Sequence, residues 1–150
     1  MQQVIDIVII SISNPIKIGL YKDNKLFETI QTKEMTSDFL PKFFDDILKK
    51  YKIKNIIYSN GPGSYMSIKL TYIFLKTLQI TKNIDVFAQD GFYFNKNKPI
   101  KAIGKKYFVK ENDTITIKES NEVGEFELPQ SLDYSNFSSE IEPIYILNAV

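Results

Sequence analysis

Three β-rich segments open the chain. Residues 4–12 (VIDIVIISI) are apolar almost throughout, as expected of a strand that is covered on both faces. Residues 25–32 (KLFETIQT) alternate between apolar and polar positions, as an edge strand does. Residues 17–23 lie between them, and turn-forming SNP and DN steps join the three segments. The pattern predicts a three-stranded antiparallel meander.

The apolar spacing changes to a helical period in two later segments. Residues 36–51 and 64–79 predict helices, with Thr36 or Ser37 as the N-cap of the first and Ser64 as the N-cap of the second. Both segments carry apolar residues on more than one side, which is more than a helix flanking a sheet needs. The surplus favours a partner subunit against these helices, with a second lobe as the alternative.

Short strands are predicted at residues 55–60 and 84–89. The resulting order, β-β-β-α-β-α-β, predicts an α/β fold whose first lobe, residues 1–90, is ribonuclease-H-like, of the actin/Hsp70 type. The composition then changes, and residues 91–150 predict a small, degenerate, mainly β second lobe that ends in an irregular tail.

Composition limits the chemistry that the chain can perform. The sequence has no Cys and no His, which excludes thiolate nucleophiles and the commonest metal ligand and general base. Acid–base chemistry is thereby left to Asp, Glu, Lys and Tyr. Its 19 basic residues are all lysine and are spread along the chain, and the net charge is +1, so a dedicated nucleic-acid binder is not expected. No apolar stretch has membrane-spanning length, and the expected location is cytoplasmic.

A glycine- and proline-rich stretch, residues 61–64 (GPGS), separates the second helix from the preceding strand. It lacks the Lys and Ser or Thr that follow the last glycine of a Walker A loop, and it lacks the three-glycine spacing of a dinucleotide-binding turn. Pro62 also removes a backbone donor. In isolation the stretch predicts a structural turn in which Gly61 and Gly63 adopt conformations unfavourable for other residues.

Three other groups invite a chemical interpretation. Asp45 and Asp46 are adjacent on a helix, where side chains diverge by about 100°, so a solvated face is expected. Asp6 could bind magnesium as in a nuclease, but no convincing second or third carboxylate accompanies it. Aromatic residues alternate with lysines in residues 91–108, which suits either base stacking or a core with lysines facing water.

The stretch SNGPGSYMSIKL resembles the GPGSFTGLRIG signature of the TsaB (YeaZ) family, which takes part in making threonylcarbamoyladenosine on tRNA. EMTSDFLP is similar to the first-helix segment of that family, and IEPIYILNAV is similar to its closing motif. The resemblance covers about the first 90 residues and the tail, and it implies a member with a shortened second lobe.

The resemblance implies a noncatalytic scaffold, without catalytic or metal-binding residues, that activates TsaD, the subunit that transfers the threonylcarbamoyl group, and that recruits the ATPase TsaE. It implies no cofactor of the chain's own, although ATP or ADP can enter the complex. It allows a homodimer when TsaD is absent, indirect or weak tRNA contact, and no membrane contact. The signature turn is Gly61, Pro62, Gly63 and Ser64, and the residues expected to contact a partner are Ser37, Leu40, Phe44, Met66, Ile68, Lys69, Tyr72 and Leu75.

The chain departs from the family pattern at several positions. The strand-one Asp is replaced by Ile10 or Ser11, which makes independent ATP hydrolysis less expected, and Met35 stands for the usual helix His. Ser67 and Thr71 replace small residues that let helices approach closely, which implies either a shifted interface or a partner that has co-varied. Further departures are Met66, Lys69 and Leu147. A self-associating, nucleotide-binding or nucleotide-hydrolysing domain of the actin-like fold remains the leading alternative, and a nuclease is the third.

Overall fold

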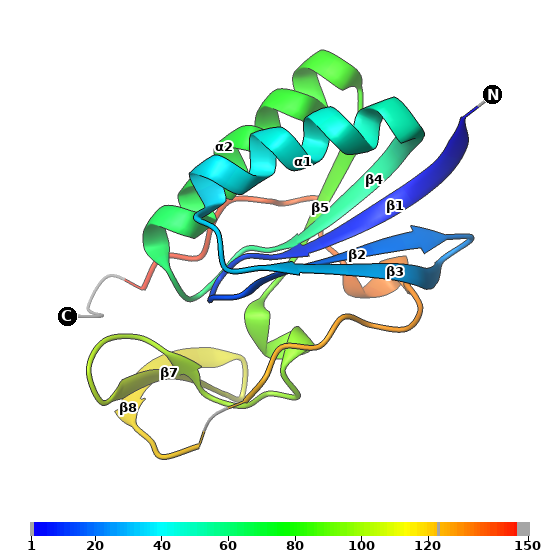
Figure 1. The fold of residues 1–150 in the computed structure, drawn as a ribbon. Helices are drawn as coiled ribbons and strands as arrows, with labels where there is room; N and C mark the ends of the chain where they lie inside the picture. Colours follow the sequence, from blue (N-terminus) through cyan, green and yellow to red (C-terminus); the bar gives the residue numbers. More distant parts are fainter. Residues whose placement is uncertain (1, 123, 147–150) are drawn as a thin grey trace.

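A five-stranded mixed sheet carries two helices on one face and faces a smaller antiparallel sheet on the other side (Figure 1). The computed structural model describes residues 2–122 and 124–146. The elements of the first lobe follow one another as three strands, a helix, a strand, a helix and a strand. They are β1 (Gln3–Ile10), β2 (Ile16–Lys22), β3 (Lys25–Thr32), α1 (Thr36–Lys50), β4 (Tyr51–Ser59), α2 (Tyr65–Lys82) and β5 (Asp85–Gln89).

The large sheet has the strand order β3-β2-β1-β4-β5. β1 pairs antiparallel with β2 and parallel with β4, and β4 pairs parallel with β5. β1 lies at the centre and is buried on both faces: Ile5, Ile7 and Ile9 belong to the core under the helices, and Val8 and Ile10 to the core on the other side. The nearly continuous apolar run of this strand is thereby explained.

Several element boundaries and caps differ from the sequence-based expectation. β4 begins at Tyr51, directly after α1, because Tyr51 and Ile53 already pair with β1. The N-cap of α1 is Met35, and no side chain caps it. Neither Thr36 nor Ser37 is the cap, so that prediction is wrong. Ser64 does occupy the N-cap of α2, but its side chain makes no capping hydrogen bond.

The second lobe is small and packs beneath the first. A 3-10 helix, η1 (Gly91–Phe94), leads into β6 (Ile100–Lys101), β7 (Lys106–Glu111) and β8 (Thr114–Glu119), which form an antiparallel sheet in the order β6-β7-β8. Its core is continuous with the lower face of the large sheet, because Phe92, Phe94 and Phe108 join Val8 and Ile10 in one buried cluster.

The remaining chain returns to the first lobe. Residues 126–132, which we call the strap, run along the lower face of the large sheet (Figure 1), where the Tyr21 hydroxyl donates to the Pro129 carbonyl at 2.6 Å. After η2 (Tyr134–Asn136), the tail, residues 137–146, pairs with β5 through Ala88 and Ser138. The described residues after β5, 90–122 and 124–146, therefore contain a three-stranded lobe followed by segments that pack on the first lobe. No helix in the described ranges is long and apolar enough to cross a membrane.

Candidate functional site

The GPGS turn joins β4 to α2 and is packed tightly against the turn that follows β1. Gly61 and Gly63 have φ values of 120° and 159°, a backbone region that disfavours other residues. A Cβ on Gly63 would lie 2.6 Å from the backbone oxygen of Ile12. The amide of Ser64 donates a hydrogen bond to the same oxygen at 2.9 Å. Glycine at position 63 is therefore required by a close backbone approach.

The same turn holds three segments together. The Gly61 carbonyl accepts a hydrogen bond from the Gly91 amide at 2.9 Å, and the Asn60 carbonyl accepts one from the Ile144 amide at 2.7 Å. A phosphate cradle needs several free amide donors at one point, whereas here the Ser64 amide is occupied and Pro62 has none. The geometry favours a structural junction between the first lobe, η1 and the tail.

Hydroxyl groups connect α1, α2 and the end of β1. Ser11 Oγ and Thr71 Oγ1 share a buried hydrogen bond of 2.8 Å, and Ser67 Oγ donates to the Ser11 carbonyl at 2.6 Å. Thr36 Oγ1 bonds to Ser67 Oγ. Ser67 and Thr71 were expected to alter a partner interface, but both face the interior of this chain, and Thr71 is fully buried.

The structure divides the eight residues expected to contact a partner into two groups. Four of them are at most 3% exposed and are not accessible to a partner: Leu40, Phe44, Ile68 and Leu75. Leu40, Phe44 and Leu75 are buried because α1 and α2 pack on the sheet and on each other, as the Phe44–Phe74 ring contact at 5.4 Å illustrates. Ile68 is buried in the other core cluster, with Val8 and Ile10. This packing of α1 against α2 buries part of the extra apolar surface that the sequence assigned to the two helices. Accessible surface remains at Ser37, Met66, Lys69 and Tyr72.

One face of α2 stays apolar and exposed. The side chains are 60%, 36%, 51% and 75% exposed at Met66, Leu70, Ile73 and Ile80, respectively, and we call these four residues the α2 stripe. Their spacing of four, three and seven residues places them on one side of a helix. Of these four, only Met66 was among the residues expected to contact a partner. The spacing was the available signal for the others, but Ile80 lay beyond the predicted end of the helix.

The carboxylates that the sequence singled out are engaged in contacts with neighbouring side chains. Asp6 accepts hydrogen bonds from the Tyr134 hydroxyl at 2.7 Å and from the Asn55 amide and side chain at 3.2 Å each, which ties β1 to η2 and β4. Burial, reinforced by Asp6, raises the pKa of Tyr134. Asp45 forms an exposed ion pair with Lys49 at 3.2 Å. Among the described residues, no three acidic side chains gather where they could hold a metal ion.

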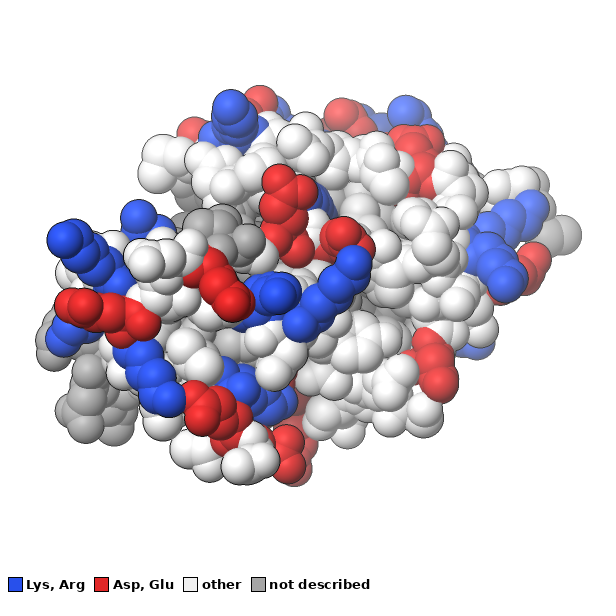
Figure 2. All heavy atoms as spheres, turned by 90° about the horizontal axis from the view of Figure 1, so that it is seen from below, with Lys and Arg blue, Asp and Glu red and all other residues white. Residues whose placement is uncertain are grey.

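The aromatic and lysine-rich segment after β5 forms part of the core. Phe92 and Phe94 are each 3% exposed, so neither offers a face for base stacking. Tyr93 is 38% exposed, but its ring packs against Phe94 and Phe137. Figure 2 shows basic and acidic side chains interspersed on the lower face, without a single-sign field. The core interpretation of this segment is favoured.

The fold resembles solved structures. YeaZ from Pseudomonas aeruginosa superposes with a TM-score of 0.59 at 10% identity, over 80% of this chain and 65% of that chain. A second structure, an uncharacterised protein with similarity to peptidase YeaZ from Pseudomonas aeruginosa, gives a TM-score of 0.54 at the same identity and coverage. This chain thus spans 65% of their length. No family model and no curated protein matches the sequence. At this identity the likeness shows the fold.

Proposed function

We propose that this chain is a noncatalytic scaffold subunit of the TsaB type, which binds TsaD through the α2 stripe and so supports threonylcarbamoyl transfer to tRNA. The single observation that carries the proposal is an apolar helix face that this chain leaves exposed. Large exposed apolar patches are typical of protein interaction surfaces, since their burial removes apolar area from water. Met35, 71% exposed, adds to the patch beside Met66, with which it lines a small hollow.

The fold supports the family assignment. The strand order β3-β2-β1-β4-β5, with two helices on one face, suits a ribonuclease-H-like first lobe. The GPGS turn that resembles the family signature sits at the junction of β4 and α2, where its glycines are needed by the packing. The likeness to YeaZ, obtained from the structure, agrees with the resemblance that the sequence alone gave.

The chemistry of the chain supports a role without catalysis. The sequence has no His or Cys, so paired-histidine metal binding and a Ser-His nucleophile are excluded by composition. Asp6 is engaged by Tyr134 and Asn55 in a structural contact. A subunit that acts by holding another one needs an accessible surface more than it needs reactive groups, and α2 offers such a surface.

The remaining assignments follow from the proposed pairing. TsaE joins the complex of this chain with TsaD, and ATP or ADP belongs to that complex and not to this chain alone. Contact with tRNA is indirect or weak. The complex assembles in the cytoplasm. In the absence of TsaD, the same stripe on two copies supports a homodimer, because a two-fold axis brings one patch against itself. The shortened second lobe is compatible with this arrangement, since the stripe lies entirely on the first lobe.

The test mixes the protein with TsaD from the same organism and measures the complex mass and dissociation constant by analytical ultracentrifugation. We compare wild type with a Met66→Asp, Ile73→Asp double variant. Both residues are more than half exposed, so the fold should tolerate the change. Ile103→Asp is the matched control, because Ile103 is 54% exposed but lies on the second lobe. Circular dichroism checks the folding of all variants.

We expect a one-to-one complex with wild type and with Ile103→Asp, and binding weakened at least about tenfold in the double variant, which corresponds to roughly 1.4 kcal/mol. Equal binding by the double variant would place the interface elsewhere. If wild type forms no complex at micromolar concentration and instead binds ATP tightly, the nucleotide-binding alternative replaces the scaffold proposal.

A further inference from the structure

Two exposed lysines lie beside the α2 stripe at a regular spacing. Lys69 comes three residues after Met66 and four before Ile73, and Lys76 has the same spacing between Ile73 and Ile80. Residues three and four apart are neighbours on a helix surface, so each lysine is flanked by two apolar side chains of the stripe. We call Lys69 and Lys76 the lysine ridge.

The lysine ridge has no acidic counterpart on its own helix. The segment Tyr65–Lys82 contains no Asp or Glu, although a solvated helix is commonly stabilised by acid–lysine pairs one turn apart. Within residues 2–122 and 124–146, neither Lys69 nor Lys76 forms an ion pair. The Lys69 ammonium lies 5.9 Å from the centre of the Tyr65 ring, which carries no formal charge. Two positive charges beside the stripe thus lack a carboxylate in the described chain.

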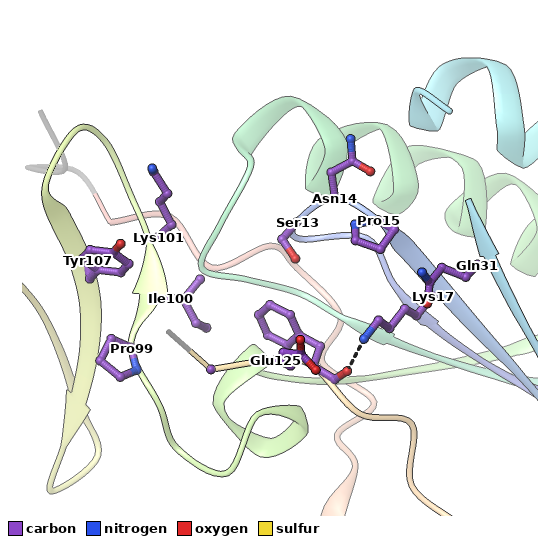
Figure 3. A pocket seen from close by; sticks show the side chains of 12 residues that line it. Ser13, Asn14, Pro15, Lys17, Gln31, Pro99, Ile100, Lys101, Tyr107 and Glu125 are labelled. Carbon is purple, nitrogen blue, oxygen red and sulfur yellow. Dashed lines mark hydrogen bonds between the residues drawn. The ribbon is translucent and has the colours of Figure 1, made fainter. Parts of the chain in front are cut away.

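Other lysines do have partners within the chain. On α1, which lies beside α2 on the same face of the sheet, Lys49 pairs with Asp45 at 3.2 Å (Figure 1). Between the two lobes, the Lys17 ammonium donates a hydrogen bond of 2.6 Å to the Phe126 carbonyl (Figure 3). The lack of acidic residues is therefore a property of α2 and not of the helical layer as a whole.

A partner that covers the α2 stripe also removes water from the lysine ridge. A charge that loses its hydration needs a paired charge or a hydrogen-bond acceptor, so a purely apolar partner would lose at the ammonium groups part of what it gains at the stripe. A partner with carboxylates beside its own apolar patch would gain at both places.

We propose that the partner surface that covers α2 has an apolar centre bordered by carboxylates, and that these carboxylates pair with Lys69 and Lys76. The two lysines are seven residues apart, roughly 10 Å along the helix axis, which matches acidic residues at the same spacing on a partner helix. The inference rests on the proposed function, in which the partner is TsaD, and adds the chemistry by which that partner is selected. Charges at the rim of an interface act mainly on association rate and specificity, so the ridge orients TsaD and the stripe supplies the apolar contact.

The test compares TsaD binding by wild type, by a Lys69→Glu, Lys76→Glu double variant and by a Lys101→Glu, Lys105→Glu control. The control changes the net charge equally, but both of its lysines are exposed on the second lobe. Circular dichroism checks folding. Immobilised TsaD gives association and dissociation rates at low salt and at about 1 M salt, where the screening length is roughly 3 Å.

We expect the ridge variant to bind TsaD at least about tenfold more weakly at low salt, mainly through slower association, and the control to bind within about twofold of wild type. At high salt the difference should largely disappear, because screening removes both the attraction and the repulsion.

The outcomes separate this inference from the scaffold proposal. If wild type binds TsaD and the ridge variant binds equally well at low salt, or if the control loses as much, the acidic partner surface is overturned while the scaffold proposal stands. If wild type forms no complex with TsaD, both are overturned. Binding of wild type to phosphatidylglycerol vesicles, lost in the ridge variant, would then assign the lysine ridge to an anionic lipid surface.

Discussion

At the scale of single residues, the constraint on the GPGS turn lies in one close backbone approach. Gly63 sits against the Ile12 carbonyl, to which Ser64 donates a hydrogen bond. A side chain at position 63 would separate the turn from the end of β1 and would move α2 with it. Gly104 offers a contrast: its φ is also positive, at 58°, but nothing lies within 4 Å of where a Cβ would be.

Comparing Gly63→Ala with Gly104→Ala separates two contributions to the loss of stability, the steric clash and the backbone conformation. We expect Gly63→Ala to lower the free energy of unfolding by about 3 kcal/mol, because a Cβ only 2.6 Å from the Ile12 carbonyl oxygen adds a steric clash to an unfavourable φ. Gly104→Ala should cost about 1 kcal/mol, the cost of the left-handed conformation alone. Urea denaturation measures both. Equal losses would mean that the contact with Ile12 relaxes at little cost.

At the scale of elements, hydroxyl groups fix how α1 and α2 sit on the end of β1. Thr71 Oγ1 donates to the Ser67 carbonyl one turn earlier at 2.8 Å and also shares a hydrogen bond with Ser11 Oγ. Ser67 and Thr71, which stand where the signature that this chain resembles has small residues, therefore form an internal contact. Thr77 makes the same bond to its own preceding turn, to the Ile73 carbonyl at 3.0 Å, but it is exposed and touches no second element through its hydroxyl.

Thr71→Val and Thr77→Val test whether the contact between elements is the stabilising one. Valine keeps the shape of threonine but removes the hydroxyl. We expect Thr71→Val to destabilise the fold by about 1–2 kcal/mol, because Ser11 Oγ is left buried without its partner. Thr77→Val should change stability by less than about 0.5 kcal/mol. Thermal unfolding and urea titration both report the difference, and a neutral Thr71→Val would show that Ser11 finds another partner.

The hydrophobic pattern was sufficient to predict the elements of the first lobe, because a continuous apolar run marked β1, alternation marked β3, and a helical spacing marked α1 and α2. It placed β3 at residues 25–32, as observed. It failed at boundaries and caps, where tertiary pairing decides: β4 starts at Tyr51 because β1 is there to pair with it. The sequence also could not show that Leu75 is buried whereas Ile73 is exposed, because this depends on which side of α2 contacts α1 and the sheet.

At the scale of the whole molecule, the tail completes the first lobe. The Tyr58 hydroxyl, fully buried, donates to the Ile141 carbonyl, and the Asn60 side chain donates to the Glu142 carbonyl at 3.0 Å. Ile141 is 3% exposed within the core under the helices. Residues far apart in sequence thus share one core, and the tail is part of the domain that presents the α2 stripe.

A chain that ends at Ser139 tests this dependence. Its loss of Ile141 exposes apolar core, and the Tyr58 hydroxyl and the Asn60 side chain lose their partners. We expect the free energy of unfolding to fall by about 4 kcal/mol, a large share of the 5–15 kcal/mol typical of a domain. A synthetic peptide of residues 137–146 should restore part of the urea midpoint, whereas a scrambled peptide should not. An unchanged midpoint in the shortened chain would show that the first lobe is stable without the tail, and the α2 stripe would then belong to a lobe that folds independently of it.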